Sequence, residues 1–295
     1  MAAGGDAMKI LVTGAAGQLG QALRSVLEPR HAVSWTDRDE LDVRDLAALR
    51  AWVREQRPEA IVHLAARTDV DGCEGQGEIA FEINSLGTRY AALAARESGA
   101  RLVFLSSDYV FDGAQARPYL EYDDPHPLNV YGWSKVHGER AVRELAGDHF
   151  IVRTSGLFAC GGCNFPEAIL RAAGEGRAIE VVDDQICRPT YAPHLAEAVG
   201  MLLESTCFGT YHVASAGATS WCDFARAILS EAGLDPSLVR PIPSGRLGRP
   251  ARRPAQSVLD TRAFELTFGR VLPSWREGLG EFFASRGAAG KGEAR

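Results

Sequence analysis

The chain has 295 residues, of which 46% are hydrophobic and 24% charged, as expected of a globular chain long enough for two lobes. Its formal net charge of −6 excludes a general attraction to nucleic acid or anionic membranes, and no apolar run approaches the ~20 residues of a membrane-spanning helix. Because no signal-peptide core is present and six scattered cysteines fit no disulfide framework, we expect a cytoplasmic protein without nucleic-acid or membrane partners.

The first predicted element is a buried strand over residues 9–13, which runs directly into a glycine turn and a helix over 21–27. The turn has Gly-x-x-Gly-x-x-Gly spacing, and a strand, glycine turn and helix in this order form a dinucleotide-binding fingerprint. Glycine lets backbone N–H groups approach a pyrophosphate at the positive end of the helix. The alternative is a tight turn that needs glycine only for packing. We predict cofactor contacts from Gly14, Gly17, Gln18, Leu19 and Gly20.

The second predicted strand, over residues 32–36, ends at two side chains with opposite cofactor preferences. A carboxylate at Asp37 can accept hydrogen bonds from the ribose hydroxyls of NAD, whereas Arg38 beside it matches the 2′-phosphate of NADP. Asp42 and Val43 follow before the next helix, and Asp42 either faces the adenine amino group or caps that helix. Both NADH and NADPH therefore stay open as cofactors.

Two further strands are predicted over residues 60–66 and 101–105, with a helix that contains Asn84 between them. Strands that alternate with helices predict an α/β fold with a doubly wound parallel sheet, whose ligands lie beyond the carboxyl ends of the strands. Small and polar residues occupy both of these ends: Ala65, Ala66, Arg67, Ser106, Ser107, Asp108 and Tyr109. We expect the cofactor and the substrate to meet there.

A predicted helix start over residues 129–135 contains a tyrosine and a lysine suited to proton transfer. Tyr131 and Lys135 are four residues apart, so they share one helix face. An ammonium beside a phenol favours the phenolate, and we expect Lys135 to lower the pKa of Tyr131 from its usual value of about 10. Such a tyrosine can exchange a proton with a carbonyl oxygen near neutral pH. The bare spacing also occurs by chance on surface helices, so its significance rests on the strand ends described above.

Three motifs share this part of the chain: the glycine turn, Ser-Ser-Asp-Tyr-Val-Phe-Asp-Gly over 106–113, and Tyr-Gly-x-Ser-Lys-x-x-Gly-Glu over 131–139. Together they resemble the extended short-chain dehydrogenase/reductases, and more narrowly the dTDP-4-dehydrorhamnose reductase family. Later stretches agree with this resemblance, at 153–155, 164–165, 183–185, 189–190, 220–221 and 251–254. The similarity covers residues 8–283, and the 106–113 block and the late Arg-Arg-Pro are its most specific parts.

The resemblance implies that NADPH or NADH reduces the C4 keto group of a nucleotide sugar, a dTDP-4-keto-6-deoxysugar. Tyr131 would donate the proton, and Lys135 would lower its pKa and hold the nicotinamide ribose. Ser107 would bind the carbonyl oxygen and Asn84 would order a proton-relay water, unless local hydrogen bonds satisfy both.

The implied cofactor contacts are Gly14, Gly17, Gln18, Leu19, Gly20, Asp37, Arg38, Asp42, Val43, Ala65, Ala66, Arg67, Asn84, Ser106, Tyr131 and Lys135. The implied substrate contacts are Val70, Ser107, Asp108, Tyr109, Tyr131, Asn164, Phe165 and Arg253. No metal is expected, and a homodimer is one assembly that the resemblance allows.

The chain departs from the family pattern at several places. Ser107 stands where the family usually has Thr, which keeps the hydroxyl, and Gly156 stands where it often has Trp, which reshapes one wall of the sugar pocket. The short cysteine-bearing loop over 159–163 and the pair Cys187-Arg188 also differ.

Two alternative functions of the chain stay open. One is a reductase for another nucleotide keto sugar of antibiotic biosynthesis, including the dihydrostreptose type. The other is a non-catalytic NADP-binding subunit like the β subunit of methionine adenosyltransferase.

The second half of the chain is expected to form a smaller α/β substrate-binding lobe. We predict a dinucleotide-binding Rossmann domain over residues 8–158, to which 190–214 return, and a substrate lobe over 159–286, mainly 159–189 and 215–286.

A proline-interrupted basic loop lies late in this predicted lobe and contains Arg246, Arg249, Arg252 and Arg253. It is either a solvated charge run or, because guanidinium groups match phosphate oxygens, the site for the diphosphate of a nucleotide sugar. Both chain ends, residues 1–7 and 287–295, are expected to be disordered.

Overall fold

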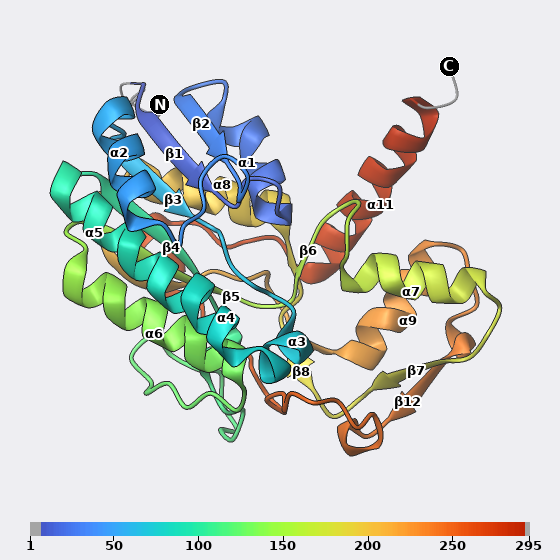
Figure 1. The fold of residues 1–295 in the computed structure, drawn as a ribbon. Coiled ribbons are helices and arrows are strands. Elements are labelled where there is room, and N and C mark those ends of the chain that lie inside the picture. The colour runs from blue at the N-terminus through green and yellow to red at the C-terminus, as the bar shows by residue number, and fades with distance from the viewer. Residues whose placement is uncertain (1–6, 293–295) are drawn as a thin grey trace.

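The computed structural model describes residues 7–292, and its centre is a six-stranded parallel sheet in the order β10-β5-β4-β3-β1-β2 (Figure 1). The strands are β1 (Lys9–Thr13), β2 (Ala32–Thr36), β3 (Ala60–His63), β4 (Arg101–Ser107), β5 (His149–Thr154) and β10 (Gly209–His212). All neighbouring strands run parallel. β2 lies on one side of β1, whereas β3 and the later strands are added on the other side. The carboxyl ends of β1 and β3 therefore flank the topological switch point. The predicted fold class is confirmed.

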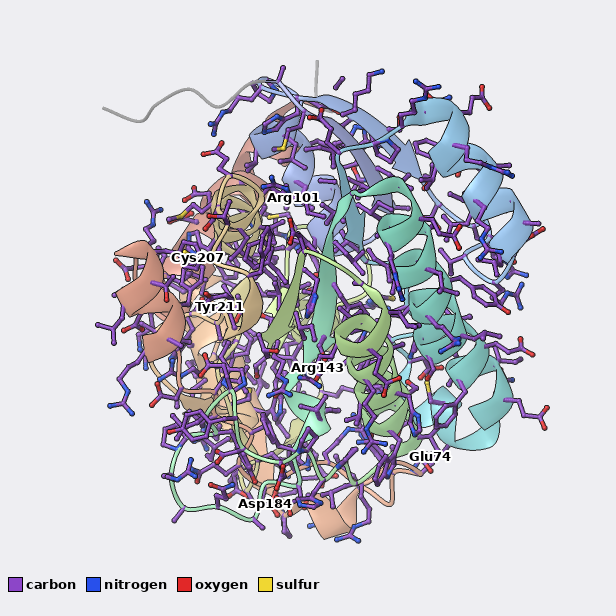
Figure 2. All side chains as sticks on the ribbon, turned by 90° about the vertical axis from the view of Figure 1, so that its left-hand side faces the viewer. Glu74, Arg101, Arg143, Asp184, Cys207 and Tyr211 are labelled. Carbon is purple, nitrogen blue, oxygen red and sulfur yellow. The ribbon has the colours of Figure 1, made fainter. Side chains whose placement is uncertain are left out.

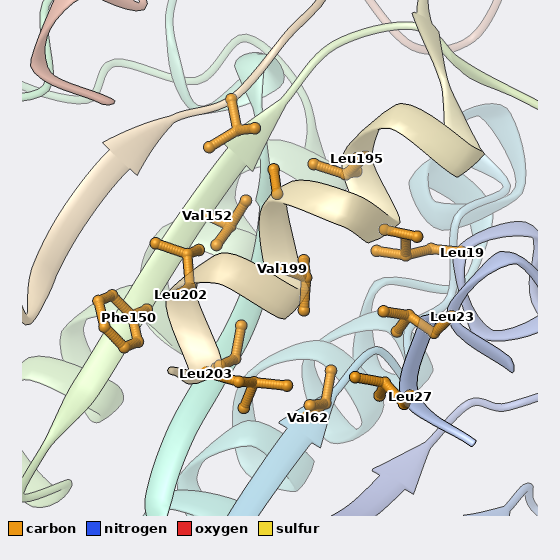
Figure 3. Close-up of a cluster of buried hydrophobic side chains, with 14 of the residues drawn as sticks. Leu19, Leu23, Leu27, Val62, Phe150, Val152, Leu195, Val199, Leu202 and Leu203 are labelled. Atoms are coloured by element: carbon orange, nitrogen blue, oxygen red, sulfur yellow. The ribbon is translucent and has the colours of Figure 1, made fainter. Parts of the chain in front are cut away.

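Helices cover both faces of this sheet (Figure 1). One face is covered by α1 (Gln18–Leu27) and α8 (Ala192–Leu203), the other by α2 (Leu46–Gln56), α5 (Thr88–Ser98) and α6 (Val130–Leu145). Leu19, Leu23 and Leu27 follow one another at one-turn spacing on α1 and face Leu195 and Val199 of α8 (Figure 3). Each fully buried leucine contributes roughly 1.5–3 kcal/mol of transfer free energy, so this layer stabilises the packing of α1 and α8 on the sheet.

A second lobe is assembled from two separate stretches of the chain (Figure 1). Its elements are α7 (Phe165–Gly174), β7 (Ile179–Val182), α9 (Trp221–Glu231), β12 (Val239–Ile242) and α11 (Trp275–Gly292). β7 pairs in parallel with β12, and the helices pack around Phe158, Phe224 and Phe282. Two short pairs lie between the lobes: β6 (Leu157–Phe158) with β9 (Thr190–Tyr191), and β8 (Ile186–Cys187) with β11 (Thr219–Ser220).

Between these two stretches, α8 and β10 return to the main sheet. The Tyr211 hydroxyl donates to the Cys207 carbonyl oxygen at 2.8 Å, and Arg101 of β4 donates to the Leu203 carbonyl oxygen at 2.6 Å. Figure 2 shows Arg101, Cys207 and Tyr211 together along this edge. The returning strand is therefore fastened by side chains as well as by its pairing with β5.

Several element boundaries differ from the predicted ones. α1 begins at Gln18, so Gln18, Leu19 and Gly20 form its first turn and are not part of the preceding loop. The strand predicted over 60–66 ends at His63. α11 continues to Gly292, because a helix already nucleated by its packed first half propagates easily, so the prediction of disorder is wrong over 287–292. The predicted disorder of residues 1–6 and 293–295 lies outside the described residues.

Candidate active site

Two polar side chains fix the start of α6, the helix that contains Tyr131 and Lys135. The Oδ1 atom of Asn129 accepts the Gly132 N–H at 2.8 Å. Glu74, on α3 (Val70–Gly75), accepts the first backbone N–H of α6 at 2.8 Å (Figure 2). Glycine is required at position 132, because a Cβ there would lie 2.2 Å from the Tyr109 carbonyl oxygen. The helix therefore packs directly against the segment that follows β4.

Tyr131 is buried beside Ser107, and its pKa differs from the predicted one. Burial raises the pKa of Tyr131 to about 12, and a hydrogen bond with Ser107 opposes this only in part. The prediction that Lys135 brings this pKa below its usual value is wrong, because burial of the phenol outweighs every lowering effect. The Lys135 Nζ atom lies 4.3 Å from the centre of the Phe104 ring. Burial also lowers the pKa of Lys135 itself, to about 7. At neutral pH Tyr131 is a protonated phenol, which is the form that donates a proton.

Ser107 and Asp108 lie where β4 passes into a short 3-10 turn. The Ser107 hydroxyl donates to Asp108 Oδ1 at 3.1 Å and accepts the Tyr109 N–H at 3.1 Å. The Oδ2 atom of Asp108 accepts the hydroxyls of Ser155 at 2.8 Å and Ser257 at 2.5 Å. Asp108 is 3% exposed, and burial raises its pKa to about 6. Hydroxyls of the protein thus engage both oxygens of this carboxylate, and the substrate contact of Asp108 stays a prediction.

The glycine turn lies at the switch point between β1 and β3. Gly14 has a φ of +70°, and a Cβ there would lie 2.6 Å from the Ala65 nitrogen, so only glycine lets the two strand ends meet. Gly17 precedes α1 without a side-chain cap, which leaves the positive helix end available to a phosphate. Among residues 7–292, the buried Gln18 Oε1 and Arg67 Nε atoms have no hydrogen-bond partner. These features fit a dinucleotide cofactor.

The predicted cofactor residues that follow β2 differ in the hydrogen bonds and ion pairs that they make within the protein. Asp37 accepts a backbone N–H of the glycine turn and the Arg38 N–H, both at 2.8 Å, and the Arg38 side chain is exposed. Asp42 pairs with Arg44 at 2.6 Å, and this hydrogen-bonded pair lowers the pKa of Asp42 to about 2. The alternative that Asp42 caps α2 is wrong, because Asp45 is the cap.

Asn84 is fully buried in a π-helical turn over Glu82–Gly87. Its Nδ2 donates to the Arg67 carbonyl oxygen at 3.1 Å and to Ser134 Oγ at 2.8 Å, while its Oδ1 accepts the Arg67 N–H at 2.7 Å. Local hydrogen bonds thus satisfy the Asn84 amide, as the local alternative expects, and the proton-relay role of Asn84 stays a prediction.

The other predicted cofactor residues have mainly internal contacts. Leu19 packs in the core beneath the turn, and Gly20 is needed because a Cβ would lie 2.5 Å from the Ala15 carbonyl oxygen. Ser106 Oγ donates to the buried Glu139 carboxylate at 2.6 Å. Val43 is buried and Ala66 is partly exposed beyond β3.

A cavity of about 730 Å³ lies between the sheet and the second lobe. Four predicted substrate residues line it: Val70, Tyr109, Phe165 and Arg253. Tyr109 also contacts the Tyr131 ring edge to face, with centroids 6.1 Å apart, and so connects the cavity to the proton donor. Asn164 instead caps α7, where its Oδ1 accepts the Glu167 N–H at 3.2 Å.

Sequence reasoning missed several cavity-lining residues, among them Trp221, Gln185 and Leu247. The Trp221 ring packs on Phe165 with centroids 4.6 Å apart, so the two aromatic side chains form one wall. An aromatic residue at the start of a predicted helix was the available signal for Trp221. Gln185 lies in the stretch 183–185 that agrees with the family and Leu247 in the basic loop, but neither pattern shows that the side chain lines a cavity, because each reaches it only through the folding of the lobe.

Arg253 joins the basic loop to the cofactor half of the molecule. Its two terminal nitrogens donate to the two carboxylate oxygens of Asp71 at 2.9 and 2.8 Å, and it lines the cavity together with Tyr109. Arg249 lies 3.5 Å from the same carboxylate. The predicted diphosphate site is therefore a folded arginine cluster at the cavity wall, and Asp71 balances part of its charge.

A glycine turn at the switch point of the sheet, together with a buried tyrosine and lysine on α6, places the chain among the extended short-chain dehydrogenase/reductases. Within this class, the chain belongs to the dTDP-4-dehydrorhamnose reductase family, since residues 8–287 match the family model described as RmlD substrate binding domain. Within residues 7–292, no helix combines the length and hydropathy that spanning a bilayer requires.

Relatives of this family match over nearly their whole length. The dTDP-4-dehydrorhamnose reductase of Streptomyces griseus is 41% identical over 289 residues, which cover 95% of each chain. The spore coat polysaccharide biosynthesis protein SpsK of Bacillus subtilis is 39% identical over 282 residues, covering 95% of this chain and 99% of that one. The crystal structure of the Bacillus anthracis dTDP-4-dehydrorhamnose reductase in complex with NADP has a TM-score of 0.92 at 38% identity, covering 95% and 99% of the two chains.

Proposed function

We propose that the chain reduces the C4 keto group of a dTDP-4-keto-6-deoxysugar with NADPH or NADH, forming dTDP-L-rhamnose from dTDP-4-dehydro-L-rhamnose, or a close relative. The observation that supports this most is the protonated Tyr131, which is buried beside Ser107 and connected through Tyr109 to a cavity of about 730 Å³. The names of the similar reductases, and the NADP in one of their structures, agree with it.

When bound, the nicotinamide supplies the hydride, and the residues of the chain supply the proton and hold the reactants. Tyr131 donates its phenolic proton to the carbonyl oxygen as negative charge develops there. Ser107 lies beside Tyr131, and its hydroxyl turns from Asp108 to donate to the same oxygen. Lys135 lies one helical turn further on, where it holds the nicotinamide ribose. This division of roles needs no metal ion.

The binding roles follow the two halves of the molecule. In this proposal residues 8–158 with 190–214 hold the cofactor, whose pyrophosphate lies on the glycine turn. Residues 159–189 and 215–286 hold the nucleotide sugar, with Arg253 at its diphosphate. Asp37 and Arg38 act on the adenosine ribose with opposite signs, so both NADH and NADPH are accepted. A cytoplasmic location and a homodimer stay predictions.

A second candidate is a reductase for another nucleotide keto sugar, including the dihydrostreptose type. Gly156 favours it, since its φ is +54° and a Cβ there would lie 3.1 Å from the Cα of Pro189 and 3.5 Å from the Trp221 ring. A tryptophan at this position would strain the backbone, so this chain presents a different pocket wall from relatives that have one.

Cofactor oxidation, followed by nicotinamide absorbance, tests these candidates with a panel of dTDP-, UDP- and GDP-linked 4-keto sugars. Turnover of dTDP-4-dehydro-L-rhamnose above all others supports the first proposal, and preference for another keto sugar supports the second. The matched control is Tyr131→Phe, which keeps the ring. Binding of NADP without turnover of any sugar would favour a regulatory subunit.

A further inference from the structure

Three serine hydroxyls from distant parts of the chain converge on the carboxylate of Asp108. Ser107 donates to Oδ1 at 3.1 Å, while Ser155 and Ser257 donate to Oδ2 at 2.8 and 2.5 Å. The exposed fractions are 9% for Ser107, 3% for Asp108, 1% for Ser155 and 3% for Ser257. The group is therefore a dry, paired polar network, in which each hydrogen bond is stronger than it would be in water.

This network determines the direction of the Ser107 hydroxyl. A hydroxyl has one proton, and that of Ser107 points to Asp108, while its oxygen accepts the Tyr109 N–H at 3.1 Å. The Ser107 hydroxyl also lies beside the Tyr131 phenol and favours its phenolate form. Asp108 thus holds the proton of Ser107 that this hydroxyl turns to the carbonyl oxygen in the proposed reaction. Its negative charge also raises the pKa of Tyr131, which keeps the proton on the phenol.

We propose that Ser257 is a positioning residue for the reduction, since it holds Asp108 and thereby orients the hydroxyl of Ser107 beside Tyr131. This inference rests on the proposed reductase function. Ser257 lies 149 positions from Asp108 in the sequence and acts through two intervening side chains. Loss of its hydroxyl changes the rate of proton transfer and leaves the binding of cofactor and sugar unchanged.

The same geometry predicts a change in the pH profile. The titratable groups around Asp108 are Tyr109, Tyr131 and Cys187, and burial raises the pKa of each of these, so none of them gains a proton near pH 6. The hydrogen bond from Ser257 stabilises the charged carboxylate and lowers the pKa of Asp108. Removing it raises that pKa, so the acid limb of the kcat profile moves to higher pH.

The experiment measures kcat and both KM values for Ser257→Ala in the wild-type and Ser107→Ala backgrounds. Gln256→Ala is the matched control, because it removes the neighbouring side-chain hydrogen bond to the Ala116 carbonyl oxygen at 3.2 Å and leaves Asp108 untouched. We expect Ser257→Ala to lower kcat about tenfold, the effect of losing one hydrogen bond to a charged group. Both KM values stay as they are, and no further loss occurs once Ser107 is absent. An equal loss in both backgrounds, or a raised KM at unchanged kcat, overturns the proposal.

A second readout does not depend on turnover. A ¹³C NMR titration of aspartate carboxyls, assigned with Asp108→Asn, should show a higher pKa for Asp108 in Ser257→Ala than in wild type, and an unchanged pKa overturns the proposal. Should Ser257→Ala fail to fold, Ser155→Ala removes the other donor to Oδ2 and has the same expected results. A wild-type chain that reduces no nucleotide sugar would refute the proposed function alone, since the titration tests the network separately.

Discussion

Replacing Arg253 with alanine tests the proposed diphosphate site directly. The guanidinium is 12% exposed and donates to both oxygens of Asp71 at 2.9 and 2.8 Å, so its position in the cavity wall is fixed. A charge-assisted contact with a diphosphate is worth roughly 1.5–3 kcal/mol, which corresponds to a rise of about tenfold to a hundredfold in KM for the nucleotide sugar. KM for the cofactor should not change, because the arginine lies on the substrate side.

The effect of losing the Asp71 ion pair on stability must be distinguished from the effect of losing Arg253 on substrate binding. Asp71 is 31% exposed and keeps Arg249 at 3.5 Å, so losing Arg253 should cost at most about 1 kcal/mol of stability, and the variant should fold. Lysine at position 253 should recover only part of the affinity, since an ammonium lacks the planar fork. The matched control is Arg246→Ala, which removes a cation of the same loop that pairs with Glu180 at 3.4 Å. Equal dissociation constants for the dTDP-sugar in wild type and Arg253→Ala, measured by titration calorimetry, would refute the site.

Three further substitutions test the other roles. Tyr131→Phe removes only the hydroxyl, so kcat should fall by about 10²–10⁴ while calorimetry still detects NADP binding; near-normal turnover would remove Tyr131 from the mechanism. Arg38→Ala should move the ratio of kcat/KM for NADPH over NADH toward NADH, and an unchanged ratio would show that Arg38 does not contact the 2′-phosphate. Glu139→Gln leaves the buried Arg153 without its counter-charge, and urea titration should show a loss of about 3–5 kcal/mol in the free energy of unfolding. Burial alone would raise the pKa of Glu139, but Arg153 and Arg143 hold it at about 2. The wild-type chain should therefore lose this stability as the pH falls from about 4.5 to 2, and a glutamine variant with the same slope would contradict the assignment.

Local sequence features were sufficient to predict the cofactor half of the fold. β1 and β2 have the predicted bounds of 9–13 and 32–36, because short apolar runs that end at a glycine or a charged turn leave little freedom of register. Gly14 was recognisable from its place in the Gly-x-x-Gly-x-x-Gly turn, and the close approach of its backbone to Ala65 is the physical reason for glycine there. The rule that ligands lie beyond the carboxyl ends of parallel strands then placed Ser107 and Tyr131 together.

Pairings across long sequence distances could not be predicted in this way. Arg253 is 182 positions from Asp71, and nothing local indicates which carboxylate a given arginine meets. The predicted lowering of the Tyr131 pKa was wrong for a related reason. Helical spacing brought Lys135 to the same face, but burial, which spacing does not report, raises the pKa of the phenol and lowers that of the lysine.

The buried Glu139 explains how the separate parts of the site keep their relative positions. It lies on α6, one turn beyond Lys135, and accepts Ser106 Oγ at 2.6 Å, which belongs to the strand that ends in Ser107. Arg153 of β5 donates to the same carboxylate at 2.8 and 2.7 Å. A buried ion pair contributes little net stability compared with apolar packing, because desolvation offsets most of its attraction. What this pair supplies is geometry: it ties the helix with the proton donor to the strand with the carbonyl-binding hydroxyl, where an error of about 1 Å can cost a hundredfold in rate.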